Sequence, residues 1–276
     1  MKNLITRTLT GIVFVAIILG AICYHPLTFL ALFSVITGLV MWEFYGLTNA
    51  GDNTRYKRVV ACVAGVYLFA ASFLYAHDMT GLHIFIPYLL YLIYCLILEL
   101  YTKAEDPLRN WALAFFAQLY CAGSFAMINY IAAIPDMPGE MVHAPLHVIC
   151  IFVFVWVNDT GAYLTGCTLG RHKLFERISP KKSWEGFWGG LIITLLSSQI
   201  FYYFAPEIGR WHWLGLTLVI VLFGTFGDLI ESLLKRSVGV KDSGVVFPGH
   251  GGALDRFDSL ILAIPAAFIY FELFIR

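Results

Sequence analysis

The sequence has 276 residues, of which 59% are hydrophobic and 13% are charged, and its mean hydropathy is +0.77. This composition is far more apolar than that of a soluble globular domain, so it predicts a protein that crosses a membrane several times. The formal net charge is +0 and the pI is about 7.1, which excludes a strongly basic surface for nucleic acid.

Nine apolar runs are long enough to be membrane-spanning helices, each of which needs about 20 mostly apolar residues. In chain order they cover residues 8–24, 27–48, 59–76, 82–101, 111–134, 145–167, 187–205, 211–234 and 254–275. The connecting loops are too short to hold a separate soluble domain. We therefore predict an all-α polytopic membrane protein. It forms a single integral membrane domain over 1–276, with N-terminal helices in about 8–134 and C-terminal helices, which carry the polar motifs, in about 145–275.

The first run follows two basic residues and resembles the start of a cleaved signal peptide. It has no A-x-A cleavage site, however, and a polytopic chain normally keeps such a run as its first anchor. We therefore interpret residues 8–24 as a retained helix.

The basic residues lie almost entirely in alternate loops. Of the 18 Lys and Arg residues, all but Arg210 and Arg276 lie before the first run, after the second, fourth, sixth and eighth runs, or at the start of the ninth. Because cytoplasmic loops are enriched in these residues, we expect the N-terminus to be cytoplasmic and the C-terminus external.

A first polar motif interrupts the sixth run, which reads W-V-N-D-T-G-A-Y-L-T-G from Trp156 to Gly166. Asp159 shares a helical face with Tyr163 and Gly166, so we expect the acid to point into the helix bundle, towards the second polar motif. The loop that follows is the most basic in the chain. Its Lys181-Lys182 pair could neutralise a triphosphate or an anionic lipid headgroup, although the positive-inside rule alone would also account for it.

The second polar motif runs from Asp228 to Asp258 and holds the densest charge in the chain. On a helix Asp228, Glu231, Ser232 and Lys235 fall on one stripe, and the ninth run begins with a similar stripe of acids. Ionised groups at or inside a membrane edge are costly and usually functional. Two such stripes could converge on a divalent cation, and hard oxygen ligands suit Mg²⁺.

Other roles for the same acids remain open. Asp228 or Asp255 could form a buried ion pair with Lys235 or Arg256. Glu231 could pair with Lys235 at the i+4 position. Asp258 could orient Arg256 or a metal-bound water, and His250 could order its loop.

From Ser232 to Asp258 the chain resembles the CDP-diacylglycerol synthases, also called phosphatidate cytidylyltransferases. Their motif reads S-x-x-K-R, four residues, K-D, a short spacer and P-x-H-G-G-x-x-D-R-x-D, and every charged position of it is present. Ala253 stands where the family usually has a larger apolar residue. The first polar motif is also similar to the family's N-D-T-G-A-Y and S-P-K-K-T-x-E-G, with Ser183 in place of the commoner threonine.

The resemblance implies transfer of the cytidylyl group of CTP to phosphatidic acid in the bilayer, which gives CDP-diacylglycerol and pyrophosphate for phospholipid biosynthesis. Together with the charge pattern it implies Mg²⁺ as the cofactor, with room for a second metal ion, on Asp228, Asp255 and Asp258. The catalytic residues implied are Asp228, Lys235, Lys241, Asp242, His250, Asp255, Arg256 and Asp258. The substrate-binding residues implied are Asn158, Asp159, Lys181, Lys182, Ser183, Ser232, Arg236, Gly249, Gly251 and Gly252.

The resemblance also implies a homodimer, and the short loops fit a bacterial inner membrane with the active site facing the cytoplasm. The competing interpretation is an ion-coupled transporter that uses intramembrane carboxylates. Its weakness is that the acids gather near one membrane face, beside a loop rich in glycine and lysine. The run from Gly224 to Asp228 only loosely resembles the G-x-G-D of intramembrane aspartyl proteases, and the D-G-x-x-A-R motif of CDP-alcohol phosphotransferases is absent.

Overall fold

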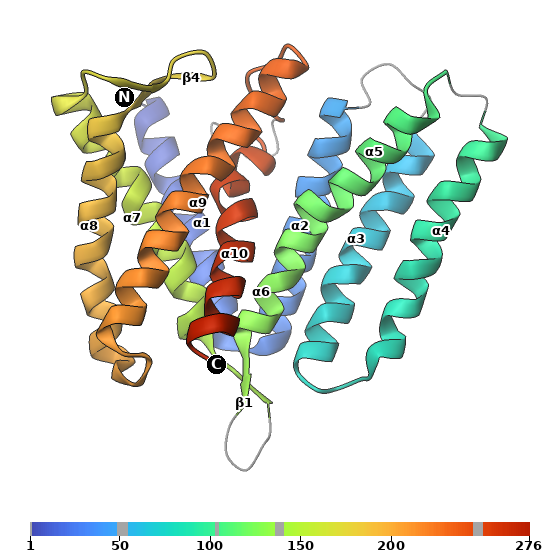
Figure 1. The fold of residues 1–276 in the computed structure, drawn as a ribbon, viewed down its shortest axis with the longest axis horizontal. Coiled ribbons are helices and arrows are strands. Elements are labelled where there is room, and N and C mark those ends of the chain that lie inside the picture. Colours follow the sequence, from blue (N-terminus) through green and yellow to red (C-terminus); the bar gives the residue numbers. More distant parts are fainter. Residues whose placement is uncertain (1, 49–54, 103–104, 136–140, 245–250) are drawn as a thin grey trace. The chain divides into compact units, whose positions relative to one another are not determined.

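The computed structural model describes residues 2–48, 55–102, 105–135, 141–244 and 251–276 (Figure 1). Its α-helices are α1 (Lys2–Tyr24), α2 (Pro26–Thr48), α3 (Arg55–Ala76), α4 (Ile86–Tyr101), α5 (Pro107–Ala117), α6 (Ser124–Ala132), α7 (Pro145–Leu169), α8 (Trp184–Phe204), α9 (Arg210–Ser237) and α10 (Leu254–Phe274). Short helical turns are η1 (Leu82–Phe85), η2 (Gln118–Gly123) and η3 (Pro206–Ile208), and the strands are β1 (Ala133–Pro135), β2 (Met141–His143), β3 (Lys173–Phe175) and β4 (Ser179–Ser183).

The helices confirm the predicted fold class. Eight of them, within the described residues, are long and apolar enough to cross a membrane, and α1 adds a shorter apolar segment, Thr10–Tyr24. Each coincides with one of the nine predicted runs to within a few residues, because an apolar run of this length can satisfy its backbone in a bilayer only as a helix. The protein is therefore an all-α polytopic membrane protein.

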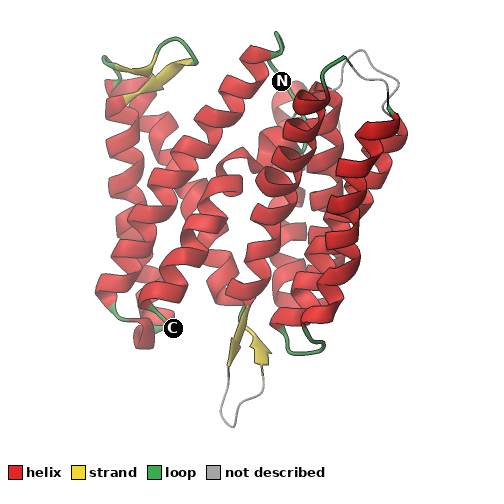
Figure 2. Cartoon of the chain, turned by 45° about the vertical axis from the view of Figure 1, so that its right-hand side comes forward, coloured by secondary structure: helices red, strands yellow, loops and turns green. Residues whose placement is uncertain are grey.

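Two local features were not predicted. The fifth run is a helix interrupted by the π-helical turn η2, where the buried Gln118 donates a hydrogen bond of 2.9 Å to the carbonyl oxygen of Ala61. Two loops also form antiparallel ribbons, β1 with β2 and β3 with β4, drawn in yellow in Figure 2. Strands of three to five residues are too short for a period-two pattern to be visible in the sequence.

The contacts divide the chain into two compact units. The first holds Met1–Pro145 together with Asp242–Arg256, and the second holds Leu146–Lys241 together with Phe257–Arg276. The segment Asp242–Arg256, in the middle of the second polar motif, thus packs with the N-terminal helices. Residues that are adjacent in the motif belong to different units.

Aromatic rings form much of the core of each unit. In the first unit the ring of Phe29 in α2 packs at a tilt against that of Phe33, with centroids 4.7 Å apart, and against that of Phe69 in α3, at 6.2 Å. In the second unit Phe154, Phe201 and Trp213 join α7, α8 and α9. The Trp213 indole donates a 3.0 Å hydrogen bond to the carbonyl oxygen of Ala205, so its one polar atom is satisfied.

Two histidines pack against each other at the edge of the first unit. The Nδ1 atom of His77 lies 3.0 Å from the carbonyl oxygen of Phe73, and Nε2 of His143 lies 3.2 Å from that of Ile22. The two rings stack with their centroids 5.8 Å apart. Burial lowers the pKa of both imidazoles, and the neighbouring His77 and His25 lower the pKa of His143 further.

We expect this pair to make the protein less stable in acid. A histidine whose folded-state pKa lies below its unfolded value of about 6.5 stabilises the fold above that pH and loses this contribution as the pH falls below it. The unfolding temperature in detergent should therefore fall by a few degrees between about pH 7 and pH 5. His77→Phe, which keeps a ring without a titrating group, should flatten this dependence, whereas the same change at the exposed His83 should not. Equal pH profiles for all three proteins would contradict the prediction.

Candidate active site

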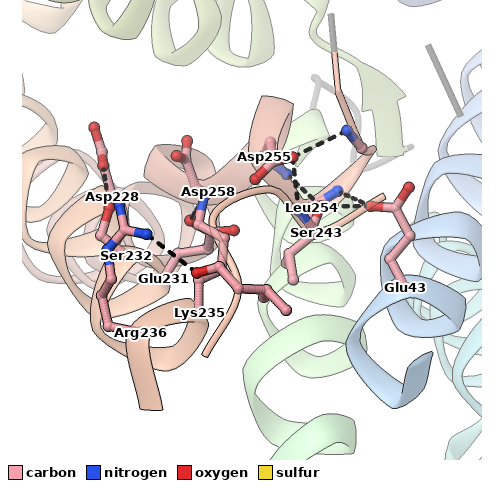
Figure 3. A network of polar contacts seen from close by, with 12 residues as sticks. Glu43, Asp228, Glu231, Ser232, Lys235, Arg236, Ser243, Leu254, Asp255 and Asp258 are labelled. Carbon is pink, nitrogen blue, oxygen red and sulfur yellow. Dashed lines mark hydrogen bonds and ion pairs between the residues drawn. The ribbon is translucent and has the colours of Figure 1, made fainter. Parts of the chain in front are cut away.

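The polar stripe predicted on α9 is present, and its members have separate partners (Figure 3). Glu231 is fully buried, and its carboxyl group forms an ion pair of 2.5 Å with Lys235 one helical turn later. The i+4 pairing that the sequence left open for these two residues is therefore confirmed. Asp228 instead accepts a 3.3 Å hydrogen bond from Ser232 through Oδ1 and forms an ion pair through Oδ2 with Lys182.

A cavity of about 280 Å³ opens beside this ion pair in the second unit. Its lining includes predicted residues from both polar motifs, namely Asn158, Asp159, Lys181, Lys182, Ser183 and Asp228. The remaining lining is mostly small or apolar, with Ser259 of α10 as a further hydroxyl. The tertiary structure thus brings together two motifs that lie about 45–70 residues apart in the sequence.

Asp159 faces the second motif, as expected. It lines the cavity together with Asp228, although the residue is exposed. One residue earlier, Asn158 is 7% exposed, and its Oδ1 atom has no hydrogen-bond partner among the described residues. The helical period therefore identified the right part of α7, but the buried polar side chain is the amide.

The β3–β4 ribbon carries the two lysines to the cavity. Ser183 ends β4 and caps α8, because its hydroxyl oxygen accepts a 3.1 Å hydrogen bond from the backbone N–H of Gly186. Glu185 holds the same end of the ribbon, where β3 begins, by accepting hydrogen bonds from the backbone of Arg171 and His172 and from Nδ1 of His172, the last at 2.6 Å. Glu185 was not predicted as a site residue, although it is the acidic position of the S-P-K-K-S-W-E-G motif and could have been recognised there.

Glycines let α7 and α8 approach closely beneath the lysine ribbon. A Cβ atom on Gly190 would lie 2.6 Å from Oδ1 and 2.8 Å from the backbone oxygen of Asn158. A Cβ atom on Gly186 would lie 2.9 Å from the backbone oxygen of Ala162. All three distances are shorter than van der Waals contact, so only glycine allows this approach.

We expect Gly190→Ala to lower both stability and activity. The added methyl group must push α8 away from Asn158, and overpacking of this kind typically costs about 1–3 kcal/mol. Gly20→Ala is the matched control, because a Cβ atom there would meet nothing within 4 Å. Thermal unfolding in detergent should show a lower midpoint for the first variant alone. An unchanged midpoint for Gly190→Ala would contradict the close packing described here.

Asp258 also belongs to the second unit. Its Oδ1 atom accepts a 2.6 Å hydrogen bond from the backbone N–H of Ser259. Gly227 of α9 packs against this part of α10, since a Cβ atom there would lie 2.6 Å from the backbone oxygen of Asp258. The helices that carry Asp228 and Asp258 are therefore in close contact. Within the described part of the chain, no three His, Cys, Asp or Glu side chains form a ready-made metal cluster.

Asp255 lies in the first unit, at the start of α10. Its Oδ2 atom accepts hydrogen bonds of 3.0 Å from the backbone N–H groups of Ser243 and Gly252. Close by, Glu43 of α2 accepts hydrogen bonds from the hydroxyl group of Ser243 and from the N–H group of Leu254, both of 2.8 Å (Figure 3). Glu43 was not among the predicted site residues, since it is a single acid within an apolar run.

Most of the remaining predicted residues are exposed. Arg236, Lys241, Asp242 and Arg256 are exposed, and Nη1 of Arg236 donates a 3.1 Å hydrogen bond to the carbonyl oxygen of Val240. Gly251 has a φ of +85°, which a residue with a side chain rarely adopts. Gly249 and His250 lie outside the described residues, so their predicted roles stay predictions.

The cavity chemistry suits a polyanionic ligand. Two lysines and an asparagine amide offer donors to phosphate oxygens, and the carboxyl groups of Asp159 and Asp228 offer hard oxygen ligands for a cation that accompanies such a ligand. The Asp228 carboxyl group already holds the ammonium group of Lys182, so it is placed to bind positive charge.

Comparisons with known proteins identify the family. The family model described as "Cytidylyltransferase family" matches residues 5–274. The phosphatidate cytidylyltransferase of Haemophilus influenzae is 32% identical over 286 aligned positions, which cover 98% of both chains.

Those of Staphylococcus aureus (strain COL) and Staphylococcus saprophyticus are 50% and 48% identical over 120 and 154 residues. These matches cover 43% and 55% of this chain and 46% and 58% of the relatives, so the chain matches about half the length of the staphylococcal proteins. With nearly its whole length matched by the family model, the chain belongs to the cytidylyltransferase family.

Proposed function

We propose that this protein transfers the cytidylyl group of CTP to phosphatidic acid, with CDP-diacylglycerol and pyrophosphate as products. The observation that carries the proposal is the cavity in which Lys181, Lys182 and Asn158 gather around Asp228. Family membership and the names of the relatives, all phosphatidate cytidylyltransferases, support the choice of substrates.

The reaction needs charge neutralisation more than it needs a base. A phosphomonoester has a second pKa near 6, so the lipid phosphate is already largely ionised at neutral pH. One of its oxygens attacks the α-phosphorus of CTP, the bond from that phosphorus to the α,β-bridging oxygen breaks, and pyrophosphate leaves with the electron pair. Lys181 and Lys182 would hold the negatively charged oxygens of the two anionic substrates and of the departing pyrophosphate.

The acids suit a Mg²⁺ ion that arrives with the nucleotide. Mg²⁺ usually takes one or two protein carboxylates and completes its shell with water and substrate phosphates, so a three-acid cluster is not required. Asp228 and Asp258, on the contacting helices α9 and α10, would supply such oxygen ligands, and Asp255 is the third acid proposed. When bound, the ion would withdraw charge from the α-phosphate and the leaving group.

Further parts of the proposal concern the setting of the site. We propose that the protein lies in the inner membrane of a bacterium, with a cytoplasmic N-terminus and an external C-terminus. The active site would face the cytoplasm. The alternating distribution of Lys and Arg supports this orientation. A homodimer is proposed from the family resemblance alone.

The test is direct incorporation of labelled CTP into lipid. Purified protein in detergent, given phosphatidic acid and Mg²⁺, should form CDP-diacylglycerol and pyrophosphate in equal amounts. Diacylglycerol in place of phosphatidic acid is the control, because it lacks the attacking phosphate and should give no product. Absence of product over a range of divalent ions and lipids would overturn the proposal and favour the transporter interpretation.

A further inference from the structure

The least expected buried acid in the first unit is Glu43. It is the only charged residue of α2 and lies near the C-terminal end of that helix. Its side chain is 4% exposed, although nothing in its immediate sequence suggests a partner. A carboxyl group so deeply buried is costly unless other groups hydrogen-bond to it.

Its partners come from about 200 residues further along the chain. The Oε2 atom of Glu43 accepts a 2.8 Å hydrogen bond from the hydroxyl group of Ser243. The same atom accepts a second bond of 2.8 Å from the backbone N–H of Leu254, the first residue of α10. Glu43 therefore acts as an N-terminal cap for α10 that is supplied by another helix, and a carboxyl group is the favoured group at this end of a helix.

The network continues from Glu43 to Asp255 (Figure 3). The hydroxyl oxygen of Ser243, while donating to Glu43, accepts a 3.3 Å hydrogen bond from the backbone N–H of Asp255. The backbone N–H of Ser243 then donates to Oδ2 of Asp255 at 3.0 Å, as does that of Gly252. Glu43 thus fixes both Ser243 and Leu254, and Ser243 in turn holds the Asp255 carboxyl group.

Two glycines show how closely the chain wraps around Glu43. A Cβ atom on Gly244 would lie 2.5 Å from Oε1 of Glu43, and one on Gly252 would overlap both Oε2 of Glu43 and the hydroxyl oxygen of Ser243. Gly252 thus has a structural reason to be glycine that is independent of any approach by a phosphate. The position of Glu43 therefore explains why residues 244 and 252 are both glycine.

We propose that Glu43 is a positioning residue for the transfer reaction, which orients the Asp255 carboxyl group through Ser243 and the first turn of α10. The proposal rests on the proposed function, because it assigns Asp255 a part in the reaction. Glu43 itself touches neither substrate nor metal in this proposal. Its effect is transmitted by the four hydrogen bonds that join it, Ser243, Leu254 and Asp255.

The experiment compares Glu43→Ala, Glu43→Gln and Ser243→Ala with the matched control Glu99→Gln. Glu99 is also a buried acid of the first unit, 8% exposed, and its partners are Lys57 at 2.6 Å and Asn110 at 3.1 Å. Two quantities are measured in each protein: kcat with KM for CTP, and hydrogen exchange of the amides of Leu254 and Asp255. The second measurement needs neither substrate nor metal.

Glu43→Ala should lower kcat about 100-fold, the loss typical when a reacting group is displaced by about 1 Å. Its KM for CTP should change little, and exchange at Leu254 and Asp255 should become faster. Glu43→Gln keeps an acceptor oxygen, so its kcat and its exchange at these amides should be close to those of the unsubstituted protein. Ser243→Ala should give values between those of Glu43→Gln and Glu43→Ala. Glu99→Gln should keep wild-type kcat and exchange at these amides, even with a lower unfolding temperature.

Several results would overturn the inference. One is wild-type exchange at Leu254 and Asp255 in Glu43→Ala. Another is a loss of kcat that follows the unfolding temperature equally in Glu43→Ala and Glu99→Gln. If Glu43→Ala does not fold, Ser243→Ala carries the test, and wild-type kcat in that variant would count against the proposal. Absence of product from the unsubstituted chain would instead overturn the proposed function, while the exchange experiment would still decide whether Glu43 holds this segment.

Discussion

Asp228→Asn is expected to reduce cytidylyl transfer at least about 100-fold while the protein stays folded. The substitution keeps the shape of the side chain and an oxygen that can accept the hydrogen bond from Ser232. It removes the negative charge that holds Lys182 in the cavity and that would bind a cation brought by the nucleotide. The measurement is the rate of CDP-diacylglycerol formation at saturating CTP and Mg²⁺.

Glu272→Gln is the control for removing an acid from the same unit. Glu272 forms an ion pair with Arg276 near the end of α10 and does not line the cavity. This variant should keep wild-type activity. If Asp228→Asn remained as active as Glu272→Gln, the cavity beside Asp228 would not be the site of the reaction.

Lys182→Met is expected to lower kcat/KM for CTP by a similar factor, about 100-fold. The substitution removes the ammonium group that would donate hydrogen bonds to phosphate oxygens. Charge-assisted hydrogen bonds of this kind are among the stronger ones in proteins. Methionine keeps most of the apolar length of the side chain, so the packing of β4 against α8 should survive. The measurement is the CTP dependence of the rate, which separates kcat from KM.

Arg177→Met is the control for Lys182→Met, because Arg177 is an exposed cation of the same ribbon that does not line the cavity. It should leave kcat/KM almost unchanged. A double variant, Asp228→Asn with Lys182→Met, should lose much less than the product of the two single losses, since the partners form one ion pair. Equal losses for Arg177→Met and Lys182→Met would indicate a general effect of loop charge, not a specific contact.

The membrane-spanning helices could be predicted from the sequence to within a few residues at each end. A stretch of about 20 apolar residues in a bilayer has one low-energy arrangement for its backbone, the helix, so composition alone decides the element. The same physics made Asp228 and Asp258 visible as candidate site residues, because ionisable groups are rare in such runs. The pairing of Glu231 with Lys235 was one of the alternatives that the sequence left open, since i and i+4 are neighbours on any helix.

The sequence did not reveal the partners that come from other elements. The ion pair of Lys182 with Asp228 depends on the β3–β4 ribbon and on the glycines that let α7 and α8 approach. Neither feature gives a periodic pattern in the sequence. The strands are too short, and the role of each glycine depends on which atoms of the neighbouring helix lie opposite it. Both lysines of the loop looked alike in the sequence, and the structure alone distinguishes the one that meets the acid.

By itself the sequence therefore determined the fold class, the spans and the two motifs that meet in the cavity, because each of these depends on local composition and spacing. Only the tertiary structure decided that Lys182 pairs with Asp228 and that Glu43 holds Ser243 and the first residue of α10. Glu43 and Leu254 are 211 positions apart. At that separation the choice of partner is a property of helix packing, which no local pattern of residues encodes.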